Sequence, residues 1–123
     1  MKNILIAEDE ARLAAFITKG LGKKGFSTTV ASDGQEVIGM ALKEEFELLL
    51  LDLGLPDIDG LTVLKELRYQ KKNLPVIIVT AISDERTRID ALNSGANDYL
   101  TKPFSFKDLL MRIELHLGSK CSI

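Results

Sequence analysis

Four short apolar runs in this chain each end on polar residues, and the pattern recurs along the whole sequence. The runs, with the residues that follow them, are 4–7 with Glu8 and Asp9, 48–51 with Asp52, 76–79 with Thr80, and 99–101 with Lys102. Runs this short and this apolar are typical of parallel strands that are covered on both faces. Because the carboxyl ends of parallel strands meet at one edge of a sheet, where ligands bind, we expect these polar residues to converge on one crevice.

Segments with helical periodicity separate these runs. Apolar residues three and four positions apart share one helix face. Five such stripes occur: Leu13, Phe16, Ile17 and Leu21; Val37, Ile38, Ala41 and Leu42; Leu61, Leu64 and Leu67; Ile89 and Leu92; Phe106, Leu109, Leu110, Ile113 and Leu117. Residues 26–31 add a weaker strand. Since strands that alternate with helices favour βαβ units with right-handed crossovers, we predict an α/β fold with a single doubly wound sheet of five parallel strands.

The length and charge of the chain limit what it can be. Its 123 residues suit one domain with one core. The formal net charge of −2 argues against direct nucleic-acid binding, which needs a basic face. The single cysteine, Cys121, cannot form an internal disulfide, and the N-terminal apolar run is too short for a signal peptide or a membrane span. We therefore expect a cytoplasmic protein or fragment that does not contact a membrane.

One glycine-rich string has the form of a nucleotide-binding motif. Residues 20–25 read Gly-Leu-Gly-Lys-Lys-Gly and match G-x-G-x-x-G. In dinucleotide-binding proteins this string follows a strand and opens a helix. Here it closes the first helical stripe and precedes the weaker strand, so we reject the motif and interpret the glycines as a helix terminus.

Glu8, Asp9 and Asp52 are three carboxylates at two strand ends, where they would repel one another. A divalent cation relieves such repulsion, and oxygen ligands favour Mg²⁺ over zinc, which prefers His and Cys. Asp52 follows the most apolar run and is the candidate nucleophile for an aspartyl-phosphate. Lys102 and Thr80 are the candidates to neutralise and to hydrogen-bond the phosphoryl oxygens.

Each of these residues also has an ordinary interpretation. An acid or a hydroxyl after a strand commonly caps the next helix, and a lysine is common on any protein surface. These interpretations are independent of one another, whereas a single site explains all four strand ends together. The joint pattern therefore favours the site.

Five motifs give the chain a close resemblance to the receiver domain of two-component response regulators. Between Lys2 and Leu117 they are, in order, Ile6-Ala7-Glu8-Asp9-Glu10, residues 51–60 reading LDLGLPDIDG, Val79-Thr80-Ala81, residues 95–100 reading GANDYL, and Thr101-Lys102-Pro103-Phe104. The resemblance implies a flavodoxin-like (βα)5 fold with strand order 2-1-3-4-5. The chain is most similar to receivers attached to winged-helix DNA-binding domains, which implies control of transcription through a downstream domain.

The resemblance assigns roles to the residues at the strand ends. Asp52 matches the phosphoacceptor, and Lys102 matches the base that contacts the phosphoryl group. Asp9 matches a direct Mg²⁺ ligand, and Glu8 matches an acidic neighbour that acts through water. Gly54 matches the position whose backbone carbonyl completes the metal shell.

The resemblance also implies a face that responds to phosphorylation. Thr80 and Tyr99 match a switch pair, whose hydroxyl and ring move when the aspartate is phosphorylated. In the winged-helix subfamily the fourth helix, fifth strand and fifth helix form a dimer face, and Arg88, Asp98 and Arg112 fit its charge pattern. An ordinary solvated surface is the alternative interpretation, because exposed charge pairs contribute little free energy.

Three functions stay open at this point. A phosphorylation switch takes its phosphoryl group from a sensor histidine kinase, modifies itself and turns over no separate substrate. A phosphatase of the haloacid-dehalogenase type needs a second acid two residues after the nucleophile, where this chain has Gly54. A flavodoxin-like electron carrier needs a phosphate-binding loop rich in hydroxyls and glycine after the first strand, and none is present there.

The chain ends soon after the fifth helical stripe. We expect residues 1–118 to form the receiver domain and residues 119–123 to be a tail or the start of a linker. A stand-alone receiver that acts through protein–protein contact is the alternative to a transcriptional regulator.

Overall fold

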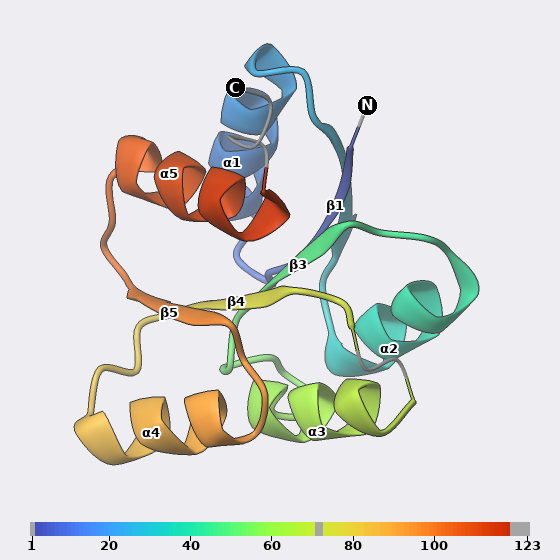
Figure 1. Cartoon of the computed structure of the whole chain (residues 1–123), viewed down its shortest axis with the longest axis vertical. Coiled ribbons are helices and arrows are strands. Elements are labelled where there is room, and N and C mark those ends of the chain that lie inside the picture. The colour runs from blue at the N-terminus through green and yellow to red at the C-terminus, as the bar shows by residue number, and fades with distance from the viewer. Residues whose placement is uncertain (1, 71–72, 119–123) are drawn as a thin grey trace.

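A computed structural model describes residues 2–70 and 73–118, in which strands and helices alternate along the chain (Figure 1). The elements are β1 Asn3–Ala7, α1 Ala11–Lys23, β2 Ser27–Ala31, α2 Gly34–Lys43, β3 Leu48–Leu51, α3 Gly60–Gln70, β4 Val76–Thr80, α4 Glu85–Asn93, β5 Asp98–Thr101 and α5 Phe106–Leu117. The strands form one parallel sheet in the order β2-β1-β3-β4-β5. The predicted α/β class and strand order are confirmed. The expected tail, with Cys121, lies outside the described residues.

The helices form one layer on each face of the sheet. Figure 1 shows α1 and α5 on one side and α2, α3 and α4 on the other. Because successive residues of a strand point to opposite faces, the core has two parts. Leu5 and Leu49 pack on the side of α2, α3 and α4, whereas Ile4 and Leu50 pack on the side of α1 and α5. The central strands are apolar throughout because both of their faces are buried.

The helices begin and end at residues whose chemistry favours those positions. The side chains of Asp33, Asp84 and Ser105 accept hydrogen bonds from backbone N–H groups in the first turns of α2, α4 and α5. Gly25 and Gly95 follow α1 and α4 with φ angles of +92° and +111°, which favour glycine. Gly25 belongs to the glycine string that the sequence predicts as a helix terminus, and that prediction is confirmed.

The glycine string at residues 20–25 does not open a helix. Gly20 and Gly22 lie inside α1, and β2 follows at Ser27, which confirms that the string is not a dinucleotide-binding motif. Gly20 has a role beyond that of a terminus, because a Cβ atom there would lie 2.5 Å from the Phe106 ring. The absence of a side chain at Gly20 therefore lets the first residue of α5 pack against α1.

Hydrogen bonds between neighbouring strands bring their carboxyl ends level with one another. Ala7 pairs with Leu51 in the register of β1 and β3, and the Asp52 N–H donates to the Ala7 carbonyl at 3.1 Å. Across β4 and β5, the Lys102 N–H donates to the Thr80 carbonyl at 2.8 Å. The polar residues at the strand ends therefore lie along one edge of the sheet.

Candidate functional site

Three carboxylates gather at the carboxyl ends of β1 and β3. One carboxylate oxygen each from Glu8, Asp9 and Asp52 lies within 4.8 Å of the other two. Glu8 is 4% exposed and Asp52 is 7% exposed, whereas Asp9 is exposed. Buried carboxylates at this spacing are costly unless a cation compensates them.

Lys102 supplies a cation to two of these carboxylates. Its ammonium nitrogen donates to Asp52 Oδ2 at 2.9 Å and to Glu8 Oε1 at 3.0 Å. Burial alone would lower the pKa of Lys102, but the hydrogen bonds to Asp52 and Glu8 outweigh it and raise the pKa. Lys102 therefore stays protonated at neutral pH and points into the site. The peptide bond that joins it to Pro103 is cis.

Burial disfavours the negative charge of the Glu8 carboxylate. Burial raises the pKa of Glu8, and the hydrogen bonds from Lys102 and from the Glu10 N–H only partly oppose this effect. Glu8 Oε2 accepts the Glu10 N–H at 3.1 Å, so both oxygens of Glu8 have a donor. The site is thus short of positive charge even with Lys102 in place.

Asp52 is held from both sides. Its Oδ2 accepts from Lys102, and its Oδ1 accepts the Gly54 N–H at 3.0 Å. Each carboxylate oxygen has two lone pairs, so each keeps one for another partner. Asp52 therefore has a defined orientation and can still act as a ligand or a nucleophile.

Thr80 and Tyr99 meet at Ile82 rather than at Asp52. The Thr80 hydroxyl accepts the Ile82 N–H at 3.4 Å, and the Tyr99 hydroxyl donates to the Ile82 carbonyl at 2.6 Å. Burial is the main cause that raises the pKa of Tyr99, so its hydroxyl keeps the proton that it donates. The sequence offered no signal for these two hydrogen bonds of Ile82, because Ile82 makes both through its backbone.

The charged residues of the expected dimer face all have partners within the chain. Arg88 contacts Glu85 at 2.6 Å on α4. Arg112 on α5 donates to Asp98 of β5 at 2.6 Å, and His116 lies 3.0 Å from the other oxygen of Asp98. A homodimer through α4, β5 and α5 stays a prediction, and its formation would have to compete with these contacts.

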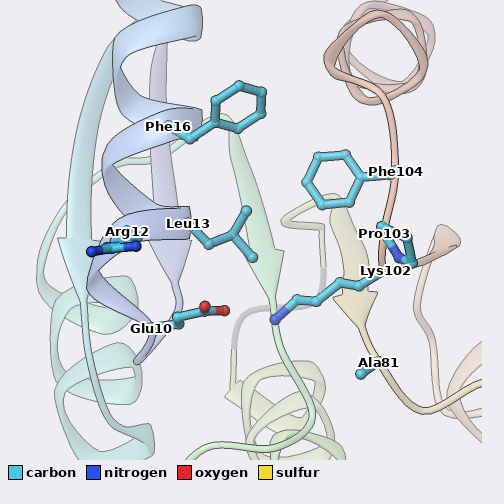
Figure 2. Close-up of a pocket in the computed structure, with 8 residues that line it drawn as sticks. All are labelled: Glu10, Arg12, Leu13, Phe16, Ala81, Lys102, Pro103 and Phe104. Atoms are coloured by element: carbon cyan, nitrogen blue, oxygen red, sulfur yellow. The ribbon is translucent and has the colours of Figure 1, made fainter.

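A pocket opens beside Lys102, between α1 and the segment that follows β5. Its volume is about 530 Å³, and its lining residues are Glu10, Arg12, Leu13, Phe16, Ala81, Lys102, Pro103 and Phe104. Figure 2 shows Leu13 and Phe16 on α1 facing Phe104 across the opening, with the Lys102 side chain reaching toward the start of α1. The pocket therefore places an apolar wall and a cation next to the carboxylates.

The donor atoms of the site suit a hard divalent cation. Carboxylate oxygens are the ligands that Mg²⁺ and Ca²⁺ prefer. Zinc prefers His and Cys, and among the residues that the structure describes neither type belongs to the cluster. Mg²⁺ usually keeps several waters and takes few carboxylates, as this partly exposed cluster would allow. The residues therefore fit the predicted ion class.

Comparison with known proteins identifies the family. Residues 4–114 match the model of the response regulator receiver domain. The Transcriptional regulatory protein HprR of Escherichia coli (strain K12) is 43% identical over 114 residues, which cover 93% of this chain and 51% of HprR. The Response regulator ArlR of Staphylococcus epidermidis is 42% identical over 113 residues, which cover 92% of this chain and 51% of ArlR. The chain thus spans about half the length of these curated relatives.

Solved structures agree in fold. The receiver domain of the Francisella response regulator 1452 has a TM-score of 0.92 at 36% identity, covering 98% of this chain and 99% of that chain. The BeF3-activated N-terminal receiver domain of Klebsiella pneumoniae RstA has a TM-score of 0.89 at 32% identity, covering 94% and 98%. With the acid cluster, Lys102 and the strand order in place, the chain belongs to the response regulator receiver domain family.

Proposed function

We propose that this chain accepts a phosphoryl group on Asp52 from a sensor histidine kinase and passes the change to its α4–β5–α5 face. The observation that carries the proposal is the position of Asp52, buried at the end of β3 with Lys102 at 2.9 Å and two further carboxylates beside it. A capping aspartate needs neither a lysine within hydrogen-bond distance nor an acidic cluster.

The transfer would be a displacement at phosphorus. A carboxylate oxygen of Asp52 forms the new O–P bond while the bond from phosphorus to the donor breaks, and its electron pair leaves with the donor. Lys102 is near enough to neutralise one phosphoryl oxygen, and the small side chain of Ala81 leaves room for the donor in the adjoining pocket. No separate substrate would be turned over.

Asp9, Asp52 and the Gly54 carbonyl are the proposed Mg²⁺ ligands, with Glu8 acting through water. The ion would neutralise charge that develops on the phosphoryl oxygens. Asp9 is exposed and has room for the ion, whereas Glu8 is buried against Lys102. This difference supports a direct role for Asp9 and an indirect role for Glu8.

The switch would use Ile82. In the unphosphorylated chain its N–H and carbonyl hold Thr80 and Tyr99, respectively. A phosphoryl group on Asp52 would attract the Thr80 hydroxyl away from Ile82, which shifts the balance of conformations on the α4–β5–α5 face.

The output is proposed to be transcriptional, through a DNA-binding domain beyond this segment, because HprR is a transcriptional regulator of about twice this length. A stand-alone receiver that acts by protein contact is the alternative. Among the described residues, no helix has the length and apolar character needed to span a membrane.

The test is mass spectrometry after treatment with a small phosphodonor and Mg²⁺. We expect a gain of one phosphoryl group in the wild type and no gain in Asp52→Asn or in EDTA. No gain in the wild type, or a gain that persists in Asp52→Asn, would refute the proposal. Turnover of a phosphomonoester far beyond one equivalent would instead favour a phosphatase.

A further inference from the structure

The loop that joins β3 to α3 is held in place at its base. The Gly60 N–H donates to the Leu53 carbonyl at 2.8 Å, and the Gly54 N–H donates to Asp52 Oδ1 at 3.0 Å. The side chains of Leu53 and Leu55 are buried. The part of the loop next to Asp52 therefore has a defined path.

The tip of the same loop is attached to a different element, the start of α2. Asp57 Oδ1 accepts the Gly34 N–H at 2.6 Å and Oδ2 accepts the Gln35 N–H at 3.0 Å. Asp33, the residue that caps α2, accepts the Glu36 N–H at 2.8 Å. Two carboxylates thus share the free N–H groups of one helix start, where the helix dipole also favours negative charge.

The attachment is tight and favours the ionised form of Asp57. Desolvation would raise the pKa of Asp57, but the hydrogen bonds from Gln35 and Gly34 outweigh it and lower the pKa. A Cβ atom on Gly34 would lie 2.9 Å from Ile58 Cβ and 3.0 Å from the Ile58 carbonyl oxygen. The loop tip and α2 therefore approach each other at a distance that only glycine allows.

We propose that Asp57 is a positioning residue for the metal site. It fastens the loop tip to α2 and so holds the backbone of Gly54 where its carbonyl serves a divalent cation. Only Leu55, which is buried, and Pro56, which has a restricted φ angle, separate Gly54 from Asp57, so a displaced tip moves Gly54. The inference rests on the proposed function, because it assumes that Mg²⁺ binds at this cluster.

The test is the Mg²⁺ dissociation constant, measured by isothermal titration calorimetry on the unphosphorylated chain. Loss of a contact that orients a metal ligand typically weakens metal binding 10- to 100-fold, and we expect about tenfold for Asp57→Ala. Asp57→Asn keeps one acceptor oxygen, so we expect a smaller loss. Asp33→Ala is the matched control, because it removes the same charge from the same helix start and leaves the loop attached.

We expect Asp33→Ala to keep the wild-type affinity within about twofold, although its thermal unfolding temperature falls. Wild-type affinity in Asp57→Ala, or an equal loss in Asp33→Ala, would overturn the inference. Thermal unfolding in EDTA shows whether each variant is folded. If Asp57→Ala is unfolded, the Mg²⁺ affinity of Asp57→Asn tests the inference in its place. Failure of the wild type to bind Mg²⁺ would instead overturn the proposed function, and this inference with it.

Discussion

Replacement of Lys102 by Met removes the cation that lies between two buried carboxylates and keeps an unbranched side chain of similar length. The ammonium lies 2.9 Å from Asp52 and 3.0 Å from Glu8. At an effective dielectric constant of about 20, each contact is a gross attraction of about 5.5 kcal/mol. Desolvation offsets much of this, and loss of one partner of a buried ion pair costs about 3–5 kcal/mol net. Because the Lys102 side chain is 17% exposed, we expect the low end, about 3 kcal/mol, at pH 7 in EDTA.

Mg²⁺ should restore much of this loss. A ligand that binds only the folded state stabilises it according to its concentration relative to the dissociation constant. Without Lys102, the carboxylates of Glu8, Asp9 and Asp52 attract the ion more strongly, so the variant gains more than the wild type. We expect saturating Mg²⁺ to reduce the difference in free energy of unfolding to less than about half.

Urea denaturation followed by circular dichroism measures both quantities in a chain that has no Trp. Lys107→Met is the matched control, because Lys107 is exposed at the start of α5 and its removal should change stability by less than about 0.5 kcal/mol. Two results would show that Lys102 does not neutralise the two carboxylates. One is a loss of unfolding free energy in Lys102→Met no larger than that in Lys107→Met. The other is equal stabilisation of the wild type and Lys102→Met by Mg²⁺.

Four further substitutions test three separate features of the structure. Burial raises the pKa of Glu8 in the folded chain above its unfolded value of 4.5, so the folded state holds the Glu8 proton more tightly than the unfolded state does. The free energy of unfolding of the wild type therefore falls as pH rises from about 4.5 toward 7. Glu8→Gln has no carboxyl at this position and should not show this fall. Urea denaturation measures the free energy of unfolding against pH, and an equal slope in the wild type and in Glu8→Gln would show that Glu8 does not cause the fall. Gly60→Ala should lower the free energy of unfolding by about 3 kcal/mol, because its Cβ would lie 2.4 Å from a backbone oxygen. Gly39→Ala, in open space on α2, should raise the free energy of unfolding by about 0.5–1 kcal/mol. Thermal unfolding compares the two variants. Asn97→Asp should raise the free energy of unfolding by about 0.5 kcal/mol at low salt, because a carboxylate strengthens the 3.0 Å hydrogen bond from Arg68. If high salt leaves this increase unchanged, its cause is not electrostatic.

Much of the fold could be predicted because its signals are local. An apolar run of four or five residues is buried on both faces wherever helices cover both sides of a sheet, and the stripes between the runs repeat at the helical period. The stop at Gly95 is likewise local, since it depends on the backbone angle of one residue. The fourth helix shows the limit of periodicity, because Ile89 is exposed and Ala91 is the buried residue of α4.

The sequence by itself placed the polar residues at the strand ends, and parallel topology then implied that these ends share an edge. It did not reveal which atoms would meet. The contact between Lys102 and Glu8 joins residues 94 positions apart, and that between Asp57 and Gly34 joins residues 23 apart. Tertiary structure also decided that Thr80 and Tyr99 both bind Ile82 and that His116 lies against Asp98. The physical reason is that pairing between elements depends on strand register and helix packing, which arise only when the whole core assembles.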